Sequence, residues 1–345
     1  MAFAVMIPVL LISYPFQAEL ANAQACTTDR INSLLYNGSR VGFGADTTGG
    51  ASASKFTVVT NTNDRGSGSL REAVTRSGSK WVIFDDSLRG KTITLNTPIK
   101  DHNGNLTIDG RGSDGRMNNI TISPKANEAF PMLQLRGGNA IIYGVTLDGN
   151  ATAGTALMAR QGNDYWFDQL TITQWFGDDA IAIGQGSEED SADKITISNY
   201  HAYNTTDAVQ AGGNDNYPNF PLHRGTLFNS HLNADDRNPR ITYGGNWHMF
   251  NNYVHGFKYG GVDINNASQM IAESNVIYDN KSYENKSESG RGSSSFVTRS
   301  TPNGPMGYIY TDNKNILIGD ARPKGNIDLS TPSPFKIPYS YNKMD

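Results

Sequence analysis

Two arginines three residues apart are the groups in this chain best suited to act on an acid. The segment Asp235–Val254, DDRNPRITYGGNWHMFNNYV, places Arg237 and Arg240 on either side of a proline. Arginine keeps its proton in ordinary surroundings, and proline breaks a helix and cannot donate to a strand ladder. The segment therefore predicts a strand end that presents two guanidinium groups, whose donors fit a planar carboxylate. A structural ion pair with Asp235 or Asp236 is the alternative, because surface ion pairs are common.

Short strands joined by turns must position these arginines. Runs that alternate β-branched and polar side chains recur along the chain between Gly and Asn residues, which predicts strands. Turn residues return at gaps of 24, 31, 30, 23 and 23 residues, at Gly144, Asp168, Asn199, Asn229, Asn252 and Asn275. Such periods are typical of stacked architectures, and asparagine tolerates the left-handed conformation of a sharp corner. The pattern predicts an all-β fold, a right-handed single-stranded parallel β-helix with stacked corner amides, in which Asp168 is structural.

One short helix and two insertions interrupt this repeat. A helix is predicted at Leu70–Ser77, with Ser69 as its N-cap and Glu72 three residues later as in a capping box. The insertions are Gly184–Asp193 and Gly212–His223. Insertions on one side of a solenoid tend to form its binding surface, so we expect both to border a cleft.

The composition favours one long solenoid over a compact core. The chain has 345 residues, a net charge of −4, 18% charged residues and one cysteine. No linker divides it, and a solenoid can reach this length because it grows by adding rungs. A slightly acidic chain without a cluster of lysines and arginines argues against nucleic acid as a partner. A single cysteine forms no disulfide within the chain, so the stacking of rungs must provide stability. We also expect the protein to be a monomer.

The N-terminus resembles a secretory signal. Residues 1–25 are apolar, with a core at Val5–Tyr14 and an A-x-A ending at Ala23–Ala25, although no Lys or Arg precedes the core. The apolar run is short for a membrane span. We therefore expect residues 1–25 to be a signal peptide, residues 26–345 to be a single secreted catalytic domain, and no membrane span. Cys26 would be the first mature residue, and lipid attachment there is a minor alternative.

The order of several motifs resembles that of the pectate lyase family, parallel β-helix enzymes that cleave polyuronates by β-elimination. The R-x-P-R sequence around Arg237, followed by H-x-F-N-N-Y, resembles the hallmark of that family. Tyr165–Asp168, YWFD, stands where the family has W-I-D-H, and Gln169 replaces the histidine. Similar blocks are G-F-G at 42–44, T-G-G at 48–50, the segment 58–74, V-I-F-D at 82–85, T-I-D-G-R-G at 107–112, I-T-I-S at 195–198 and the proline–tyrosine arm at 332–341.

The resemblance implies a reaction and roles for the arginines. Arg237 would remove the C5 proton of a uronate, which lies α to a carboxylate, before O4 is expelled. An arginine base needs a lowered pKa, which a crowded cationic site would provide. Arg240 would orient the sugar acid, with a structural ion pair as the alternative, and we expect Trp247 to bind substrate as a large, rigid aromatic. His248 is expected to be structural. The partner would be an acidic polysaccharide, with pectate or polygalacturonate first.

The sequence departs from the family at its cation-binding positions. The family's calcium ligands align with Thr155, Asp178 and Ala182, so only Asp178 is retained, with Asp179 beside it. Asp207 replaces a lysine that contacts substrate in the family, and the arginine expected five residues after Arg237 is a threonine. Calcium takes six to eight oxygen ligands, so the standard site is incomplete. We expect Asp178 and Asp179 to help hold calcium if it binds. A metal-independent site, like that of the pectin lyases or of another exopolysaccharide lyase, is the alternative.

Two other functions remain open from the sequence. The acid pair Asp178 and Asp179, in D-D-A-I-A-I, is similar to the element of polygalacturonase-type hydrolases in which two acids flank the scissile bond. The hydrolase signatures Gly-His-Gly and Arg-Ile-Lys are absent. A β-helix that only binds glycans is the third possibility, since aromatics such as Trp175, Tyr243 and Trp247 could stack on sugars. Unsaturated products would identify a lyase.

Overall fold

The structure, a computed structural model, describes most of the chain. The described residues are 28–36, 38, 40–152, 154–176, 179–184, 190–213, 222–258, 260–279, 294–299, 305–311, 314–319, 322–325, 327–328 and 335–343. The predicted signal peptide and Cys26 lie outside them. The chain divides into two units, Met1–Arg40 and Val41–Asp345. In the first unit, residues 28–35 are helical. None of the described helices is long and apolar enough to cross a membrane.

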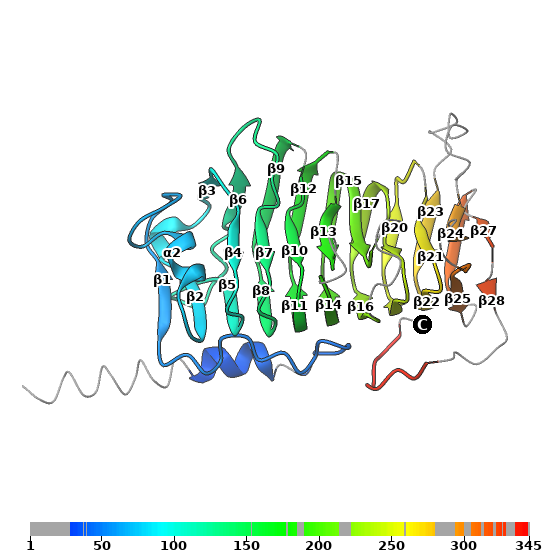
Figure 1. The fold of residues 1–345 in the computed structure, drawn as a ribbon, viewed down its shortest axis with the longest axis horizontal. Helices are drawn as coiled ribbons and strands as arrows, with labels where there is room; N and C mark the ends of the chain where they lie inside the picture. Colours follow the sequence, from blue (N-terminus) through cyan, green and yellow to red (C-terminus); the bar gives the residue numbers. More distant parts are fainter. Residues whose placement is uncertain are drawn as a thin grey trace, which may run out of the picture. The chain divides into compact units, whose positions relative to one another are not determined.

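The second unit consists of parallel strands stacked in two large sheets (Figure 1). The 11-stranded sheet runs in the order β1 (Phe56–Val59), β2 (Lys80–Phe84), β5 (Leu106–Gly112), β8 (Ala140–Tyr143), β11 (Gly162–Asp168), β14 (Ala192–Ser198), β16 (Arg224–Phe228), β19 (Asn246–Phe250), β22 (Gln269–Glu273), β25 (Tyr308–Thr311) and β28 (Ile327–Asp328). Each strand therefore pairs with strands one rung before and after it in the chain.

The 17-stranded sheet contains two runs of parallel strands that share the long strand β15 (His201–Ala211). One run is β3 (Thr92–Leu95), β6 (Thr121–Pro124), β9 (Thr146–Thr152), β12 (Thr171–Trp175), β15, β17 (His231–Asp236), β20 (Tyr253–His255), β23 (Val276–Asp279) and β26 (Ile316–Gly319). The other is β4 (Ile99–Asp101), β7 (Leu133–Leu135), β10 (Leu157–Ala159), β13 (Asp179–Ile183), β15, β18 (Arg240–Ile241), β21 (Val262–Asn265), β24 (Ser294–Arg299) and β27 (Arg322–Lys324). We call the outer side of this second run the β18 face.

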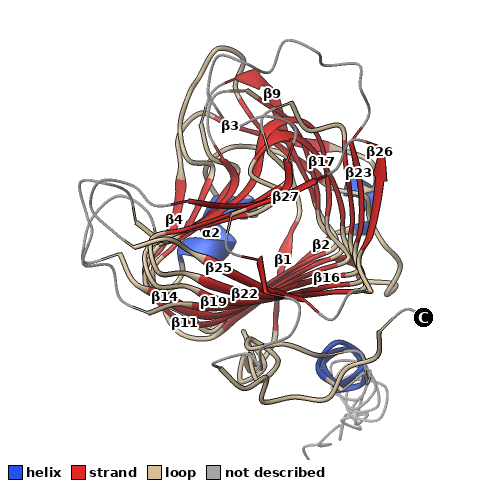
Figure 2. Ribbon diagram, turned by 90° about the vertical axis from the view of Figure 1, so that its right-hand side faces the viewer, coloured by secondary structure: helices blue, strands red, loops and turns tan. Residues whose placement is uncertain are grey.

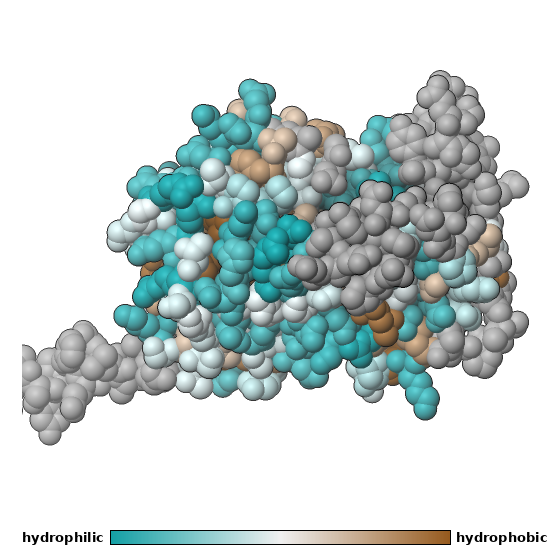
Figure 3. All heavy atoms as spheres, in the orientation of Figure 1, coloured by the Kyte–Doolittle hydropathy of each residue, from teal (hydrophilic) through white to brown (hydrophobic). Residues whose placement is uncertain are grey.

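The strands surround a common interior, as the end-on view shows (Figure 2). The buried side chains of this interior form one apolar cluster. Side chains in register stack along the interior, and each stacked residue of one ladder is fully buried: Ile108, Ile142, Phe167, Ile197, Leu227, Met249 and Ala272. In the orientation of Figure 1, the described surface is mostly hydrophilic (Figure 3). The predicted parallel β-helix is confirmed. Strand β3 alternates exposed and buried side chains, whereas β2 and β13 are buried at every position.

Asparagines form the corners, as the turn spacing predicts. Asn199 and Asn229 have φ values of 48° and 51°, in the left-handed region. Asn252 Nδ2 donates to Asn275 Oδ1 at 2.9 Å, and Asn275 Nδ2 donates to Asn315 Oδ1 at the same distance. The expected ladder of stacked amides is thus confirmed. At three corners the left-handed residue is one position away from the expected one, namely Gln169, Asn251 and Ser274.

Two short helices interrupt the strands. Helix α2 (Leu70–Thr75) begins after Ser69, whose side chain accepts a hydrogen bond from Glu72 N, so the predicted N-cap is confirmed. The Glu72 carboxylate accepts from Gly68 N at 2.8 Å. The second helix is the 3₁₀ turn η1 (Asp86–Leu88).

Candidate functional site

Arg237 lies between β17 and β18 and is clamped by two carboxylates. Its Nη1 donates to Asp179 Oδ1 at 2.9 Å and lies 3.1 Å from Asp207 Oδ2. Asp179, Asp207 and Asp236 occupy equivalent positions on β13, β15 and β17, so three carboxylates line up across neighbouring rungs. The Arg237 side chain is 24% exposed, whereas Asp179 and Asp207 are buried. The guanidinium group is therefore held through Nη1, while part of the Arg237 side chain is exposed to solvent.

This acidic setting changes the proton affinity of Arg237. Burial lowers the pKa of Arg237, but the charges of Asp179 and Asp207, the hydrogen bond to Asp179 and the charge of Asp236 together raise that pKa above its ordinary value. The expectation that a crowded cationic site lowers the pKa of Arg237 is therefore wrong, because the groups beside it, Asp179 and Asp207, carry the opposite charge.

Arg240 is placed on the outer side of β18. Its Nε lies 3.8 Å from Asp263 Oδ2, a residue in register with it on β21. With the Asn265 amide oriented to donate to Asp263 Oδ1, its oxygen accepts from Arg240 Nε at 3.2 Å. The structural ion pair considered for Arg240 is thus present. The Arg240 side chain as a whole is 20% exposed.

Trp247 is in the core, which corrects its expected role as a substrate contact. It is fully buried on β19, and a Cβ placed on the facing Gly225 would lie 2.3 Å from its ring. Its Nε1 donates to His223 Nδ1 at 3.1 Å, and His223 Nε2 in turn donates to Thr242 O at 3.0 Å. Burial lowers the pKa of His223 to about 4, so this chain of hydrogen bonds holds a neutral imidazole. The alternation of side chains along a strand could have predicted this burial, because Trp247 and Met249 are two residues apart and so share the face that points into the core.

The residues expected to hold calcium are only partly described. Asp178 lies outside the described residues, and Asp179 is paired with Arg237. Within the described ranges there is no group of three or more His, Cys, Asp or Glu side chains placed to hold a metal ion. The described side chains therefore do not provide the six to eight oxygen ligands that calcium takes, because Arg237 Nη1 already lies between Asp179 and Asp207.

Sequence reasoning missed the acids that surround the arginines. Asp207, Asp236 and Asp263 all contribute to the site, although no motif predicted a site role for them beyond an ion pair for Asp236. A signal was available, because Asp179, Asp207 and Asp236 recur at gaps of 28 and 29 residues, close to the rung period. Acids that recur at the rung period fall at one position of successive turns.

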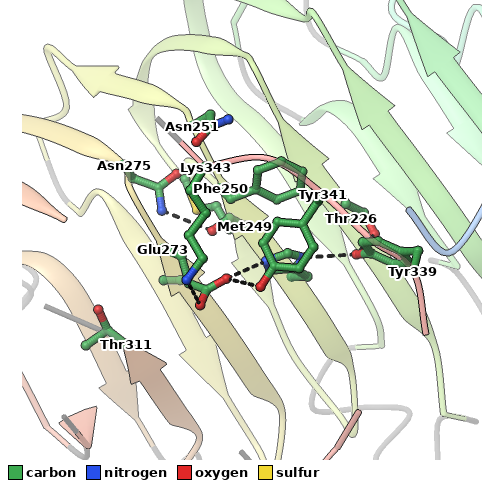
Figure 4. A network of polar contacts seen from close by, with 12 residues as sticks. Thr226, Met249, Phe250, Asn251, Glu273, Asn275, Thr311, Tyr339, Tyr341 and Lys343 are labelled. Atoms are coloured by element: carbon green, nitrogen blue, oxygen red, sulfur yellow. Dashed lines mark hydrogen bonds and ion pairs between the residues drawn. The ribbon is translucent and has the colours of Figure 1, made fainter. Parts of the chain in front are cut away.

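A second polar cluster fastens the C-terminal arm and is structural. Tyr339 Oη contacts His248 Nδ1 at 2.9 Å, and His248 Nε2 contacts Glu273 Oε2 at 3.1 Å (Figure 4). Tyr341 and Lys343 donate to the same carboxylate at 2.5 and 2.7 Å. His248 is fully buried with both nitrogens engaged, so its expected structural role is confirmed. Asp168, buried and bonded to Ser198 and Asn199, is likewise structural.

Comparison with known proteins gives relatives of one kind. No family model matches the chain. Pectate lyase 1 of Chamaecyparis obtusa is 29% identical over 221 residues, which are 59% of this chain and 56% of that protein. Pectate lyase 1 of Juniperus ashei is 30% identical over 222 residues, 59% of this chain and 58% of the relative. The probable pectate lyase P56 of Solanum lycopersicum is 27% identical over 272 residues, 72% of this chain and 66% of the relative. The chain thus spans between half and two thirds of the length of these curated relatives.

Solved structures show the same fold. The cedar pollen allergen jun a 1 has a TM-score of 0.57 at 20% identity, with 91% of this chain and 95% of that chain covered. A pectate lyase of Bacillus sp. N165, in complex with trigalacturonate, has a TM-score of 0.54 at 18% identity and covers 88% of this chain and 93% of its own. The resemblance read from the motifs is confirmed by these relatives.

Proposed function

We propose that this relative of the pectate lyases is a polysaccharide lyase that cleaves a uronate-containing polymer by β-elimination, with pectate or polygalacturonate as the first substrate to test. The observation that carries the proposal is the position of Arg237, partly exposed where β17 meets β18, with Arg240 nearby on the same strand end. The names of the curated relatives support the reaction class. A guanidinium pair suits a polymer with one carboxylate per sugar.

In this proposal Arg237 takes the C5 proton, the electron pair forms the C4–C5 double bond, and the C4–O4 bond breaks as O4 takes up a proton. Only the neutral form of Arg237 can accept a proton. Because Asp179 and Asp207 raise the pKa of Arg237, that form is scarce near neutral pH and grows as the pH rises. Turnover should therefore increase toward alkaline pH. Arg240 would hold the carboxylate that acidifies C5–H.

Substitution of Arg237 tests the proposal directly. Arg237→Lys keeps a positive charge near Asp179 and Asp207, so we expect it to fold and to lose nearly all formation of unsaturated, ultraviolet-absorbing product from polygalacturonate. Arg224→Lys is the matched control, because Arg224 pairs with Asp193 on the other sheet and should keep its activity. Full turnover by Arg237→Lys, or saturated products from every uronate polymer in a panel, would reject the proposal.

The same assay with a chelator addresses calcium. Arg237 Nη1 lies where a cation shared by Asp179 and Asp207 would have to bind, so we expect turnover to persist in chelator. Complete loss that added calcium restores would instead indicate a site that includes Asp178. The hydrolase alternative is disfavoured, because an acid buried against Arg237, as Asp179 is, is poorly placed to protonate a leaving oxygen.

Secretion is also part of the proposal. Its support is the apolar segment 1–25 with its A-x-A ending. N-terminal sequencing of the protein recovered outside the cell should begin at Cys26. A lipid on that cysteine would show as an added mass on the mature chain.

A further inference from the structure

The backbone of Arg237 has a conformation that few residue types adopt. Its φ is 53°, in the left-handed region that glycine and asparagine favour, and asparagine occupies other corners of this fold, such as Asn199 and Asn229. A residue with a longer side chain adopts this conformation at a cost in free energy, so the surrounding structure must fix it. The contacts that fix the corner at Arg237 therefore also decide where its side chain points.

The strand that leads into this corner, β17, lacks a strand neighbour on one side of its end. It pairs with β15 along its length, but with β20 only at His231 and Leu232. The chain turns away just after β20, at Gly256, where φ is 72°. Ala234 lies beyond the pairing with β20 and is buried, so its backbone N–H and C=O on that side need other partners.

The side chain of Asn238 takes the place of the missing strand. Its Oδ1 accepts from Ala234 N at 3.2 Å, and its Nδ2 donates to Ala234 O at 3.0 Å. The same Nδ2 donates to Asp236 O at 3.3 Å. An asparagine amide carries the donors and the acceptor of a peptide group, so it can pair with a strand edge as a backbone would. Asn238 is fully buried, and both hydrogens of its Nδ2 have an acceptor.

Backbone hydrogen bonds fasten the same corner to the rungs on both sides. Val209 N of β15 donates to Arg237 O at 3.1 Å, and Asn238 N donates to Gly261 O at 2.8 Å. Gly261 directly precedes β21, so these two bonds reach one rung back and one rung forward. The corner is therefore held from outside by its neighbouring rungs and from within by the Asn238 side chain.

We propose that Asn238 is a positioning residue for Arg237. Its amide holds the left-handed corner, and the corner places Arg237 Nη1 2.9 Å from Asp179 and 3.1 Å from Asp207. This inference rests on the proposed function, in which Arg237 accepts the proton. Because Asn238 is fully buried, it is out of reach of a polymer and acts on turnover through Arg237. The R-x-P-R motif leaves this position open, so the role belongs to the residue that this chain has there.

Removal of the amide tests the position of the guanidinium group directly. In Asn238→Ala, the backbone of Ala234 and Asp236 loses its side-chain partner, so the corner should relax and Arg237 should leave the two carboxylates part of the time. ¹⁵N NMR of arginine-labelled protein can detect this change, because a guanidinium group held by carboxylates rotates slowly and keeps separate Nη signals. We expect separate signals in the parent, identified by their loss in Arg237→Lys, and averaged signals in Asn238→Ala.

Turnover of polygalacturonate provides the kinetic readout. We expect kcat to fall about a hundredfold in Asn238→Ala, the cost of displacing a reacting group by about 1 Å. KM should change little, because Arg240 keeps its partner Asp263 on the β18 face. The rise of kcat with pH should also move to lower pH, since the two carboxylates would stabilise the protonated form of Arg237 less. A loss of overall stability alone would move neither the ratio of kcat to KM nor this profile.

A second buried asparagine supplies the matched control. Asn252 Nδ2 donates to Leu227 O and to Phe250 O, both at 2.9 Å, at the corner between β19 and β20. Asn252→Ala should lose comparable stability and keep the separate Nη signals, kcat and the pH profile of the parent. Asn238→Asp keeps the shape and the acceptor for Ala234 N but loses both donated bonds, so it serves if Asn238→Ala does not fold.

The outcomes separate this inference from the proposed reaction. Separate Nη signals with a normal kcat in the Asn238 variants would overturn the positioning role. Equal changes in Asn252→Ala would overturn it as well, since they would show that Asn238 only stabilises the fold. Averaged signals in the Asn238 variants, without any unsaturated product from the parent, would keep the positioning role and overturn the lyase.

Discussion

Two carboxylates from neighbouring strands set the chemistry of Arg237. Asp179 and Asp207 flank its Nη1 at 2.9 and 3.1 Å, and both are buried. Removing one partner of a buried ion pair is strongly destabilising, because it leaves the other charge buried and uncompensated. The same contacts orient the guanidinium and stabilise its protonated form. The carboxylates that position Arg237 therefore also make it less able to accept a proton.

Asp207→Asn separates those two effects. Removing one carboxylate stabilises the cation less and lowers the pKa of Arg237, so more of the neutral form exists at a given pH. We expect the rise of kcat/KM with pH to move to lower pH in Asp207→Asn. Asp263→Asn, which alters only the partner of Arg240, is the control. An unchanged profile, or one displaced to higher pH, would show that Arg237 does not accept the proton.

The roles of single residues were predictable from the sequence only in part. The R-x-P-R motif singled out Arg237, whose role as the base stays a prediction, and strand context identified His248 as structural. The role predicted for Trp247 was wrong, because the prediction used its aromatic character and did not consider that its side of the strand faces the core. The pKa of Arg237 was not predictable, since it depends on which acids meet it across rungs, and register between rungs is set by loop lengths and packing.

Among the elements, the C-terminal arm is held on the 11-stranded sheet mainly through one carboxylate. Glu273 on β22 accepts from Tyr341 and Lys343, and His248 of β19 contacts it as well. Tyr339 adds an edge contact to Phe43 and a hydrogen bond with Thr226. The arm was recognisable in the sequence as a proline–tyrosine segment. Its partner was not, because Glu273 is distant from it in the chain.

Glu273 should make attachment of the arm sensitive to acid. Burial raises the pKa of Glu273, but the hydrogen bonds from His248, Lys343 and Tyr341 and the charge of Lys343 lower it to about 2, below its ordinary value. A lowered carboxyl pKa contributes stability above its unfolded value of 4.5, and that stability is lost as the pH falls from 4.5 toward 2. Urea unfolding across this range should show a flatter pH dependence for Glu273→Gln. The exposed Glu128→Gln should follow the parent protein, and a parallel curve for Glu273→Gln would contradict the prediction.

For the β-helix unit, stability comes from stacking along the axis. The strand spacing and the corner asparagines were predictable because each repeats locally, with period two within strands and a period of 23 to 31 residues between corners. The stacks of aligned side chains were not predictable, because a small change in loop length changes which side chains of neighbouring rungs are in contact. One such stack is aromatic and titratable: the His201 and His231 rings are 4.7 Å apart, and the His231 and His255 rings are 4.8 Å apart.

That stack gives the protein a distinct sensitivity to mild acid. Burial lowers the pKa of His201, His231 and His255, and neighbouring imidazoles lower those of His201 and His255 further. A histidine whose folded pKa lies below 6.5 contributes stability above 6.5, and that stability is lost as the pH falls from 6.5 toward the lowered value, because the unfolded chain binds protons more readily. The buried His223 acts in the same direction.

We therefore expect the midpoint temperature of thermal unfolding to decrease as the pH is lowered from 7 to 5. This decrease should precede the titration of carboxylates such as Glu273. Calorimetry in buffers of different ionisation enthalpy should detect net proton uptake on unfolding in this range. His231→Phe keeps an aromatic ring in the stack while removing its central titrating group, so it should reduce both the uptake and the fall. A constant midpoint from pH 7 to 5 would mean that the stacked imidazoles protonate in the folded protein as readily as in the unfolded chain.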